Sequence, residues 1–331
     1  MTLRRAALIW CVLALAAALA LAASLMLGSV RVPAGALLDL LRGRVDGLAG
    51  GVVLDLRLPR ALSAFACGGL LALAGALMQV LLRNPLADPY VLGVSGGAGV
   101  FALLALLLAL PAIWVQASAF VGALLAISLV MALARQDFLR ADSIDGSPRL
   151  LLTGVVLATG WGAAAALILT LAPDAGLRGM LFWLTGDLNG ASHGWPAVAV
   201  LALLLLVSYP SAHRLNALLR GETVAQSVGV AVAPLRLRIY LVASLATAVA
   251  VTTAGAIGFV GLVIPHMLRL AFGNDQRMLL PAAVLGGGTL LMAADLAART
   301  VIAPAQLPVG IITALVGVPV FLWLLLRRRG R

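Results

Sequence analysis

The chain has 331 residues, of which 63% are hydrophobic and only 11% are charged, and its mean hydropathy is +1.12. A water-soluble protein of this size needs a far more polar surface, so the composition excludes a soluble enzyme and a disordered chain. The formal net charge of +11 comes from 23 arginines, no lysine and 12 acidic residues, which fall mostly between apolar runs. The sequence therefore predicts a multi-pass membrane protein embedded in a lipid bilayer, and we expect no nucleic-acid partner.

Ten apolar runs are candidate transmembrane helices. The first follows Arg4 and Arg5 and lacks a convincing cleavage site, so we interpret it as an uncleaved helix rather than a signal peptide. Two later runs are short, and Pro265 interrupts one of them, so hydropathy alone also allows nine spans. In chain order the runs are Ala6–Leu27, Ala61–Leu82, Val91–Leu110, Ile113–Ala134, Leu150–Leu171, Trp195–Ser208, Ile239–Ile257, Phe259–Phe272, Met278–Ala298 and Pro308–Leu326.

The distribution of arginine decides between nine and ten spans. With ten spans and a cytoplasmic N-terminus, sixteen arginines lie inside and seven outside, as the positive-inside rule requires. Nine spans would place the C-terminal cluster Arg327–Arg331 outside. Strands that alternate in polarity, as in a membrane barrel, are absent from the pattern. The sequence predicts an all-α bundle of ten transmembrane helices, a single domain over residues 1–331, with both termini in the cytoplasm.

Ionisable side chains are rare within the predicted spans. Asp295 lies near the outer end of the ninth run, and His266 lies beside Pro265 in the eighth. A transporter driven by protons or sodium usually needs intramembrane carboxylates, and a membrane hydrolase needs a catalytic or metal-binding cluster. A channel would need rings of charge or a carbonyl filter. We therefore disfavour these three classes and expect no metal site and no cofactor.

A chain without lysine also lacks a lysine-containing phosphate-binding loop. We expect this protein not to be an enzyme, and any ATP hydrolysis to take place on a partner subunit.

Two segments between the runs attract functional interest. On the inner side, Leu218–Gly229 forms an amphipathic stretch that predicts a short helix at the membrane surface, either a plain connector or a lever that docks into a cytoplasmic partner. On the outer side, Arg57 and Arg60 share one segment and Arg299 joins them. Arginines on the side that the topology disfavours indicate either a partner with carboxylates or snorkelling at helix ends.

Four blocks of sequence resemble the FecCD family, the permease subunits of ATP-driven importers for iron chelates, haem and vitamin B12. The blocks occur in the family's order and extend over nearly the whole chain. They are RLPR from Arg57 to Arg60, GALMQVLLRNPLADPYVLGVSGGAG from Gly75 to Gly99, GAIGFVGLVIPHMLRL from Gly255 to Leu270, and LPVGIITALVGVPVFLWLL from Leu307 to Leu325.

The resemblance implies a ten-helix bundle like that of vitamin B12 permeases and a location in the bacterial inner membrane. It also implies a homodimer, two cytoplasmic ATP-binding subunits, and a periplasmic binding protein that delivers the cargo. The cargo would be an iron chelate (siderophore or haem) or cobalamin. A free metal ion is disfavoured because it would require hard oxygen or nitrogen ligands in the path. An ion-gradient-driven secondary transporter is the alternative function.

The resemblance further implies roles for particular residues. His266 and Pro265 belong to the family signature, and we interpret His266 as structural rather than as a ligand. Pro148 departs from the small hydroxyl residues that often occupy its position. The implied sites are binding-protein docking at Arg57, Arg60 and Arg299, coupling to the ATPase at Arg220, Gly221, Glu222, Gln226 and Gly229, and a cytoplasmic gate at Ser147 and Pro148.

Overall fold

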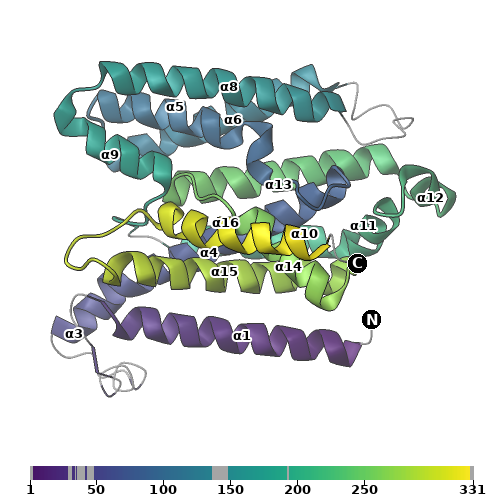
Figure 1. Ribbon diagram of the computed structural model, residues 1–331, viewed down its shortest axis with the longest axis horizontal. Helices are drawn as coiled ribbons and strands as arrows, with labels where there is room; N and C mark the ends of the chain where they lie inside the picture. Colours follow the sequence, from purple (N-terminus) through teal and green to yellow (C-terminus); the bar gives the residue numbers. More distant parts are fainter. Residues whose placement is uncertain are drawn as a thin grey trace.

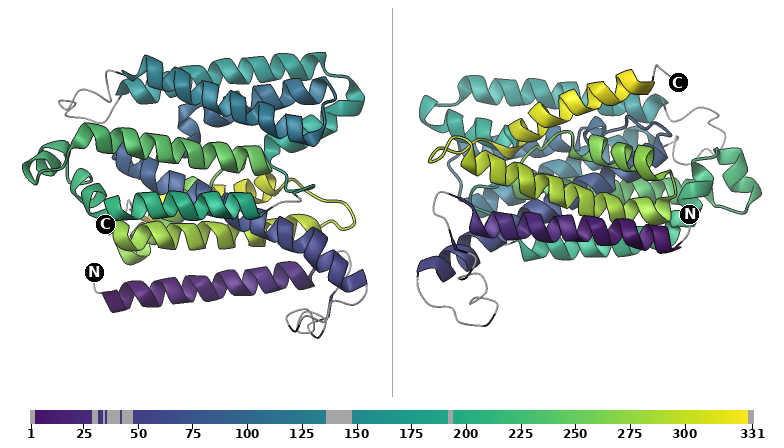
Figure 2. Two further views of the ribbon diagram at one scale, coloured as in Figure 1. Left: turned by 180° about the vertical axis from the view of Figure 1, so that it is seen from behind. Right: turned by 60° about the horizontal axis from the view of Figure 1, so that its bottom comes forward.

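The chain folds as a bundle of helices that run side by side. The computed structural model describes residues 3–28, 32–33, 35, 42, 48–135, 148–191 and 194–328, and these contain helices but no β-strand. Figure 1 shows the start of α1 (Leu3–Met26) and the end of α16 (Val309–Arg328) at the same end of the bundle. Figure 2 shows the same placement from two other sides. This arrangement agrees with an even number of crossings.

Each predicted apolar run coincides with a helix of the structure. By length and composition, seven helical segments can cross a membrane, while α5, α14 and α16 are shorter apolar helices. The protein is thus a multi-pass membrane protein, and the count of ten spans stays a prediction. The other helices of this set are α4 (Leu58–Leu81), α5 (Val94–Leu107), α6 (Ala112–Leu133), α8 (Pro148–Leu171), α10 (Trp195–Ser208), α13 (Val232–Ala254), α14 (Val260–Phe272) and α15 (Gln276–Thr300).

Helix α4 is the centre of the bundle. It is buried over most of its length and packs against α13, α14 and α15. The contact with α15 depends on glycine: a Cβ atom at Gly68 would collide with the backbone oxygen of Gly287. Small residues let the two backbones approach closely, which is how membrane helices gain packing energy where the lipid offers no hydrophobic driving force.

The helix that contains α4 begins at Leu48 rather than at Ala61, because α3 (Leu48–Gly51) and a π-helical segment, η1 (Val52–Arg57), lead into it without a break. Within an α-helix, the ring of Pro59 would clash with the carbonyl group four residues earlier. The wider π turn just before this proline provides room for it. Arg57 and Arg60 therefore lie on a helix, not on a loop.

Hydropathy alone does not predict several shorter helices. Helix α9 (Asp174–Thr185) mixes apolar residues with Arg178 and two glycines, and of its residues Met180 is buried. Helix α10 continues through η3 (Tyr209–Ser211) into α11 (Ala212–Leu218). The remaining elements are η2 (Pro89–Leu92) and α12 (Glu222–Ser227).

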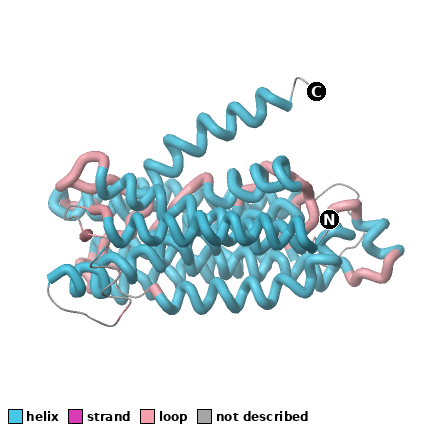
Figure 3. The backbone as a smooth tube through the Cα atoms, turned by 90° about the horizontal axis from the view of Figure 1, so that it is seen from below, coloured by secondary structure: helices cyan, strands magenta, loops and turns pink. Residues whose placement is uncertain are grey.

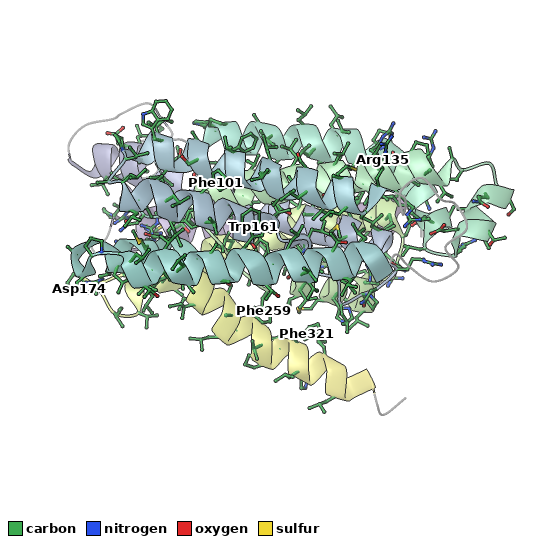
Figure 4. The ribbon with its side chains drawn as sticks, turned by 90° about the horizontal axis from the view of Figure 1, so that it is seen from above. Phe101, Arg135, Trp161, Asp174, Phe259 and Phe321 are labelled. Atoms are coloured by element: carbon green, nitrogen blue, oxygen red, sulfur yellow. The ribbon has the colours of Figure 1, made fainter. Side chains whose placement is uncertain are left out.

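Helix α16 leaves the bundle at an angle (Figure 3). In Figure 4, Phe259 and Phe321 lie along α16, on the far side of α8 from Phe101. Leu322 and Trp323 of α16 are exposed, as is much of the apolar surface of α8. Two helices with apolar faces that no part of the described chain covers are thus available to lipid or to another subunit.

Candidate functional site

Arg60 is the hub of a polar cluster at the end of the bundle opposite the chain termini. Its Nε lies 3.0 and 3.1 Å from the two carboxylate oxygens of Asp295, and its Nη2 lies 2.8 Å from Oδ1. Asp295 is 1% exposed. The remaining nitrogen, Nη1, donates to Oε1 of Gln306 at 3.0 Å and to Oδ1 of Asn189 at 3.3 Å. One guanidinium group therefore ties α4 to α15 and to the loops before α10 and α16.

The other two predicted arginines lie beside this hub. Arg299 follows Asp295 by one helical turn, and its Nε is 3.3 Å from Oδ2 of that carboxylate. Its Nη2 donates to the carbonyl of Ser24 at 3.1 Å. Arg57 is buried, and its Nη1 donates to the carbonyl of Leu25 at 2.7 Å. Together these bonds fasten the end of α1 to η1 and α15.

Two cavities open beside the cluster and share a wall. The first, of about 470 Å³, is lined by all three arginines. The second, of about 760 Å³, extends between α5, α6, α9 and the end of α13. Both are lined by Asn189, Gly190, Ala191, Pro304 and Gln306. Asn189 and Gln306, which accept hydrogen bonds from Arg60, thus form part of the wall between the two cavities.

The larger cavity carries one basic and one acidic side chain. The guanidinium of Arg178 lies 5.5 Å from the ring centroid of Phe182, and no carboxylate of the described residues forms an ion pair with it. Burial raises the pKa of Asp187, although a 2.8 Å hydrogen bond from the Asn189 amide and the charge of Arg60 act in the opposite direction. The cavity therefore offers one guanidinium group, that of Arg178, without a carboxylate partner among the described residues.

The predicted coupling residues lie at the opposite end, where α11 and α12 form what we call the coupling segment, Ala212–Ser227 (Figure 1). A short helix, α12, does form within the predicted stretch Leu218–Gly229, but it begins only at Glu222, because Gly221 adopts a φ of 114° and separates α11 from α12. Glu222 begins α12, and its carboxylate lies 3.2 Å from the guanidinium of Arg236, which is 2% exposed. This ion pair ties α12 to the start of α13.

The other predicted inner residues have different surroundings. Arg220 and Gln226 are exposed, and Gly229 turns the chain after α12 with a φ of 81°. Pro148 is the first residue of α8. Ser147 lies outside the described residues, so the proposed gate has no structural description here.

His266 is buried within the bundle. It is 1% exposed, and its ring centroid lies 6.0 Å from that of Phe321, with the rings tilted. Among the described residues, no group of three or more His, Cys, Asp or Glu side chains could hold a metal ion. Packing between α14 and α16 accounts for its position.

Sequence reasoning missed several members of these sites. The spacing of Asp295 and Arg299, four residues apart on one helix, was a readable signal for an ion pair. Asn189 and Gln306 carry no such signal, because Arg60 meets them only after the chain has folded. No local pattern marks Asn216 in α11 either, although its side chain forms hydrogen bonds with residues at the start of α15.

Comparison with known proteins identifies the group to which the chain belongs. The FecCD transport family matches residues 15–327. The chain is 40% identical over 281 residues to the vitamin B12 import system permease protein BtuC of Vibrio vulnificus, with 83% of each protein covered. It is also 40% identical over 286 residues to the hemin transport system permease protein HmuU of Yersinia pestis, again with 83% of each covered.

A solved structure is similar over almost the entire fold. It is described as an inward-facing conformation of an ABC transporter assigned to the metal-chelate type. It is 30% identical, and the superposition covers 96% of this chain and 99% of the other with a TM-score of 0.83. A family match over most of the sequence, two relatives at this identity and a shared fold lead to one conclusion: the chain belongs to the FecCD transport family.

Proposed function

We propose that this chain is the permease subunit of an ATP-driven importer that moves an iron chelate or cobalamin across the bacterial inner membrane. Two copies form the path, a periplasmic binding protein delivers the cargo, and two cytoplasmic subunits hydrolyse ATP. The permease itself makes and breaks no covalent bond. It supplies a conduit that switches between outward-open and inward-open states.

One observation carries this proposal: two polar sites lie at opposite ends of an otherwise apolar bundle. The arginine cluster with its two cavities lies at one end, and the coupling segment lies at the other, beside the chain termini. A binding protein and an ATPase must act from opposite sides of the membrane, and each can shift the equilibrium only if it binds one state better than the other. The chain offers a separate surface for each.

The outer surface suits a partner with carboxylates. Arg60, Arg299 and Arg57 bring three positive charges to one cavity, and two carboxylates, Asp295 and the lining residue Asp55, offset only part of that charge. Arginine binds carboxylates through paired hydrogen bonds, so acidic side chains of a binding protein would fit here. In the present arrangement the arginines bond within the chain, and docking would exchange some of these bonds for bonds to the partner.

The second copy of the chain fits the exposed apolar faces of α8 and α16. Side chains such as Val156, Leu322 and Trp323 lie on these faces. A path shared between two subunits would use such faces, since the lining of the 760 Å³ cavity comes from one end of the bundle.

The relatives are named for vitamin B12 and hemin, two large molecules that shield a metal ion within an organic ring. The cavity between α5, α6 and α9 is lined mainly by small, aromatic and uncharged polar residues, which suit such molecules. A free divalent ion would need a set of hard ligands instead.

Co-expression with the cognate ATP-binding subunit tests the proposal. We expect a stable detergent-solubilised complex whose ATPase activity rises when the loaded binding protein is added. A chain that purifies without any ATPase partner, and that responds to a proton or sodium gradient instead, would reinstate the secondary transporter.

A further inference from the structure

The coupling segment is bonded directly to the beginning of α15. Nδ2 of Asn216, in α11, donates to Oδ1 of Asp275 at 2.9 Å. In return, Oδ1 of Asn216 accepts from the backbone amide of Gln276 at 2.8 Å. The half-buried side chain of Asn216 thus donates to one residue and accepts from the next, both at the N-terminus of α15.

This bond pair completes the cap of α15. The first backbone amides of a helix have no partner within it and need acceptors from elsewhere. Asp275 is the N-cap residue and accepts from the amide of Arg277 at 3.1 Å. The preceding amide, that of Gln276, finds its acceptor on Asn216 in a different helix. If the coupling segment moved away alone, α15 would lose one of its capping acceptors.

Helix α15 leads from this point to the outer arginine cluster. It has 25 residues, so it extends about 37 Å at 1.5 Å per residue. Near its far end are Asp295, which binds Arg60, and Arg299. The same helix therefore carries a bond to the coupling segment at one end and the carboxylate that organises the docking arginines at the other.

Two further polar links join this end of the molecule to α13 in the described part of the chain. Glu222 of the coupling segment pairs with Arg236, and Nη1 of Arg238 donates to Oγ of Ser211, the residue just before the segment, at 3.3 Å. Helix α13 ends at the larger cavity, where Thr252 and Thr253 form part of the lining. Asn216 thus links the coupling segment to α15, whereas the other two bonds lead to α13.

We propose that Asn216 is a positioning residue that makes α15 move with the coupling segment, so that the ATPase and the docked binding protein sense each other through this helix. The inference rests on the proposed function and adds a route to it. A side chain that only stabilised the fold would affect the amount of folded protein but not the communication between the two ends. The test therefore has to measure communication.

Asn216→Ala removes both bonds. The full complex is studied in proteoliposomes, with binding protein and with hemin and cyanocobalamin tried in turn as cargo, and stimulation is expressed relative to the basal ATP hydrolysis of the same variant. We expect the stimulation of ATPase activity by loaded binding protein to fall at least about fivefold, the lower end of the range for coupling between sites. Asn274→Ala is the matched control, since Asn274 is an exposed amide beside Asp275 whose side chain accepts from Nε2 of Gln276, with no hydrogen bond to α11 among those of the described residues. It should keep wild-type stimulation.

A double substitution separates coupling from a general loss of structure. Asn216→Asp would set two carboxylates against each other at the position of the 2.9 Å bond and should abolish stimulation. Adding Asp275→Asn reverses donor and acceptor and restores the bond, so stimulation should return to most of its original value. If Asn216→Ala does not assemble with the ATPase, the comparison of Asn216→Asp with the double substitution still tests the coupling role of Asn216.

Two results would overturn the inference: wild-type stimulation in Asn216→Ala, or no recovery in the double substitution. Failure of the proposed function gives a different result, because the wild-type complex would then show no ATP-dependent uptake and no stimulation to lose.

Discussion

At the scale of single residues, Arg60 illustrates how a charge can be kept in an apolar bundle. Two of its nitrogens bond to Asp295, and the third reaches Asn189 and Gln306, so most of its donors are satisfied although its side chain is only 12% exposed. A buried charge is tolerated when it is paired and hydrogen-bonded in this way. The same orientation leaves the guanidinium at the wall of the outer cavity, where a partner can compete for it.

Arg60→Gln is expected to weaken docking of the binding protein. Hydrogen bonds to charged groups contribute about 1.5–3 kcal/mol, so we expect a loss of affinity of at least about tenfold, and a weaker dependence on salt. Surface plasmon resonance with the assembled complex measures both. Arg135→Gln, an exposed arginine at the other end of the bundle (Figure 4), is the control and should bind normally. Unchanged affinity for Arg60→Gln would remove the docking role.

Arg178 offers a way to distinguish cargoes. Its guanidinium lines the larger cavity without a carboxylate partner among the described residues, so a carboxylate-bearing cargo such as haem can use it. Arg178→Gln should slow haem uptake about fivefold, the effect of losing roughly 1 kcal/mol of attraction at an exposed site. Uptake of cyanocobalamin, which has no free carboxylate, should not change. Arg178→Lys keeps the charge and serves as the control; equal slowing for both cargoes would contradict the assignment.

At the scale of helices, close packing of α4 and α15 holds the two ends of the molecule together. The contact relies on glycine on both sides, at Gly68 and Gly287. Overpacking of a close contact costs about 1–3 kcal/mol. Gly68→Ala should therefore lower the melting temperature in detergent. Gly162→Ala, on α8, adds the same methyl group where nothing lies within 4 Å and should have little effect. Equal melting of the two variants would show that the contact is loose.

The ion pair at the start of α12 gives a second prediction for a helix. Breaking a buried pair by removing one partner costs about 3–5 kcal/mol, because the remaining charge is left uncompensated. Glu222→Arg places a second cation against Arg236 and should abolish ATP-driven uptake or assembly with the ATPase. Adding Arg236→Glu restores a pair of reversed sign and should recover uptake in part. Full activity of Glu222→Arg alone would show that this end of α12 does not couple.

The sequence was sufficient to predict the long helices, because a membrane helix must be apolar over its whole length. It was insufficient where a helix is amphipathic, as in α9, or where charges sit within it, as in the extension from Leu48 to Arg60. It also placed the start of the inner helix at Leu218, whereas Gly221 delays that start to Glu222. In each case the local conformation depends on packing or on a backbone angle that hydropathy does not report.

The candidate site shows a similar limit. The three outer arginines were predicted from their side of the membrane and from family resemblance. The structure places all three at one cavity, and two of them, Arg60 and Arg299, pair with one carboxylate. Their partners Asp295, Asn189 and Gln306 are separated from Arg60 by 129 to 246 residues. Contacts at such separations follow from the helix packing and cannot be read from a local pattern.

At the scale of the whole molecule, the bundle keeps two polar sites apart and connects them with long helices. The arginine cluster and the coupling segment lie at opposite ends of the bundle, so any communication between them has to pass through helices such as α13 and α15. Coupling free energies between distant sites are typically about 1–3 kcal/mol, comparable to a few hydrogen bonds. Small polar links at the helix ends are therefore large enough to matter.

Uptake into proteoliposomes tests the central claim most directly. The vesicles would contain the chain with its ATP-binding subunit, the binding protein would be supplied on the outer face, and labelled cobalamin, haem and a ferric siderophore would be compared with and without ATP inside. The account predicts accumulation of one of these cargoes that requires both ATP and the binding protein. Accumulation that ignores ATP and follows an imposed proton or sodium gradient would contradict it.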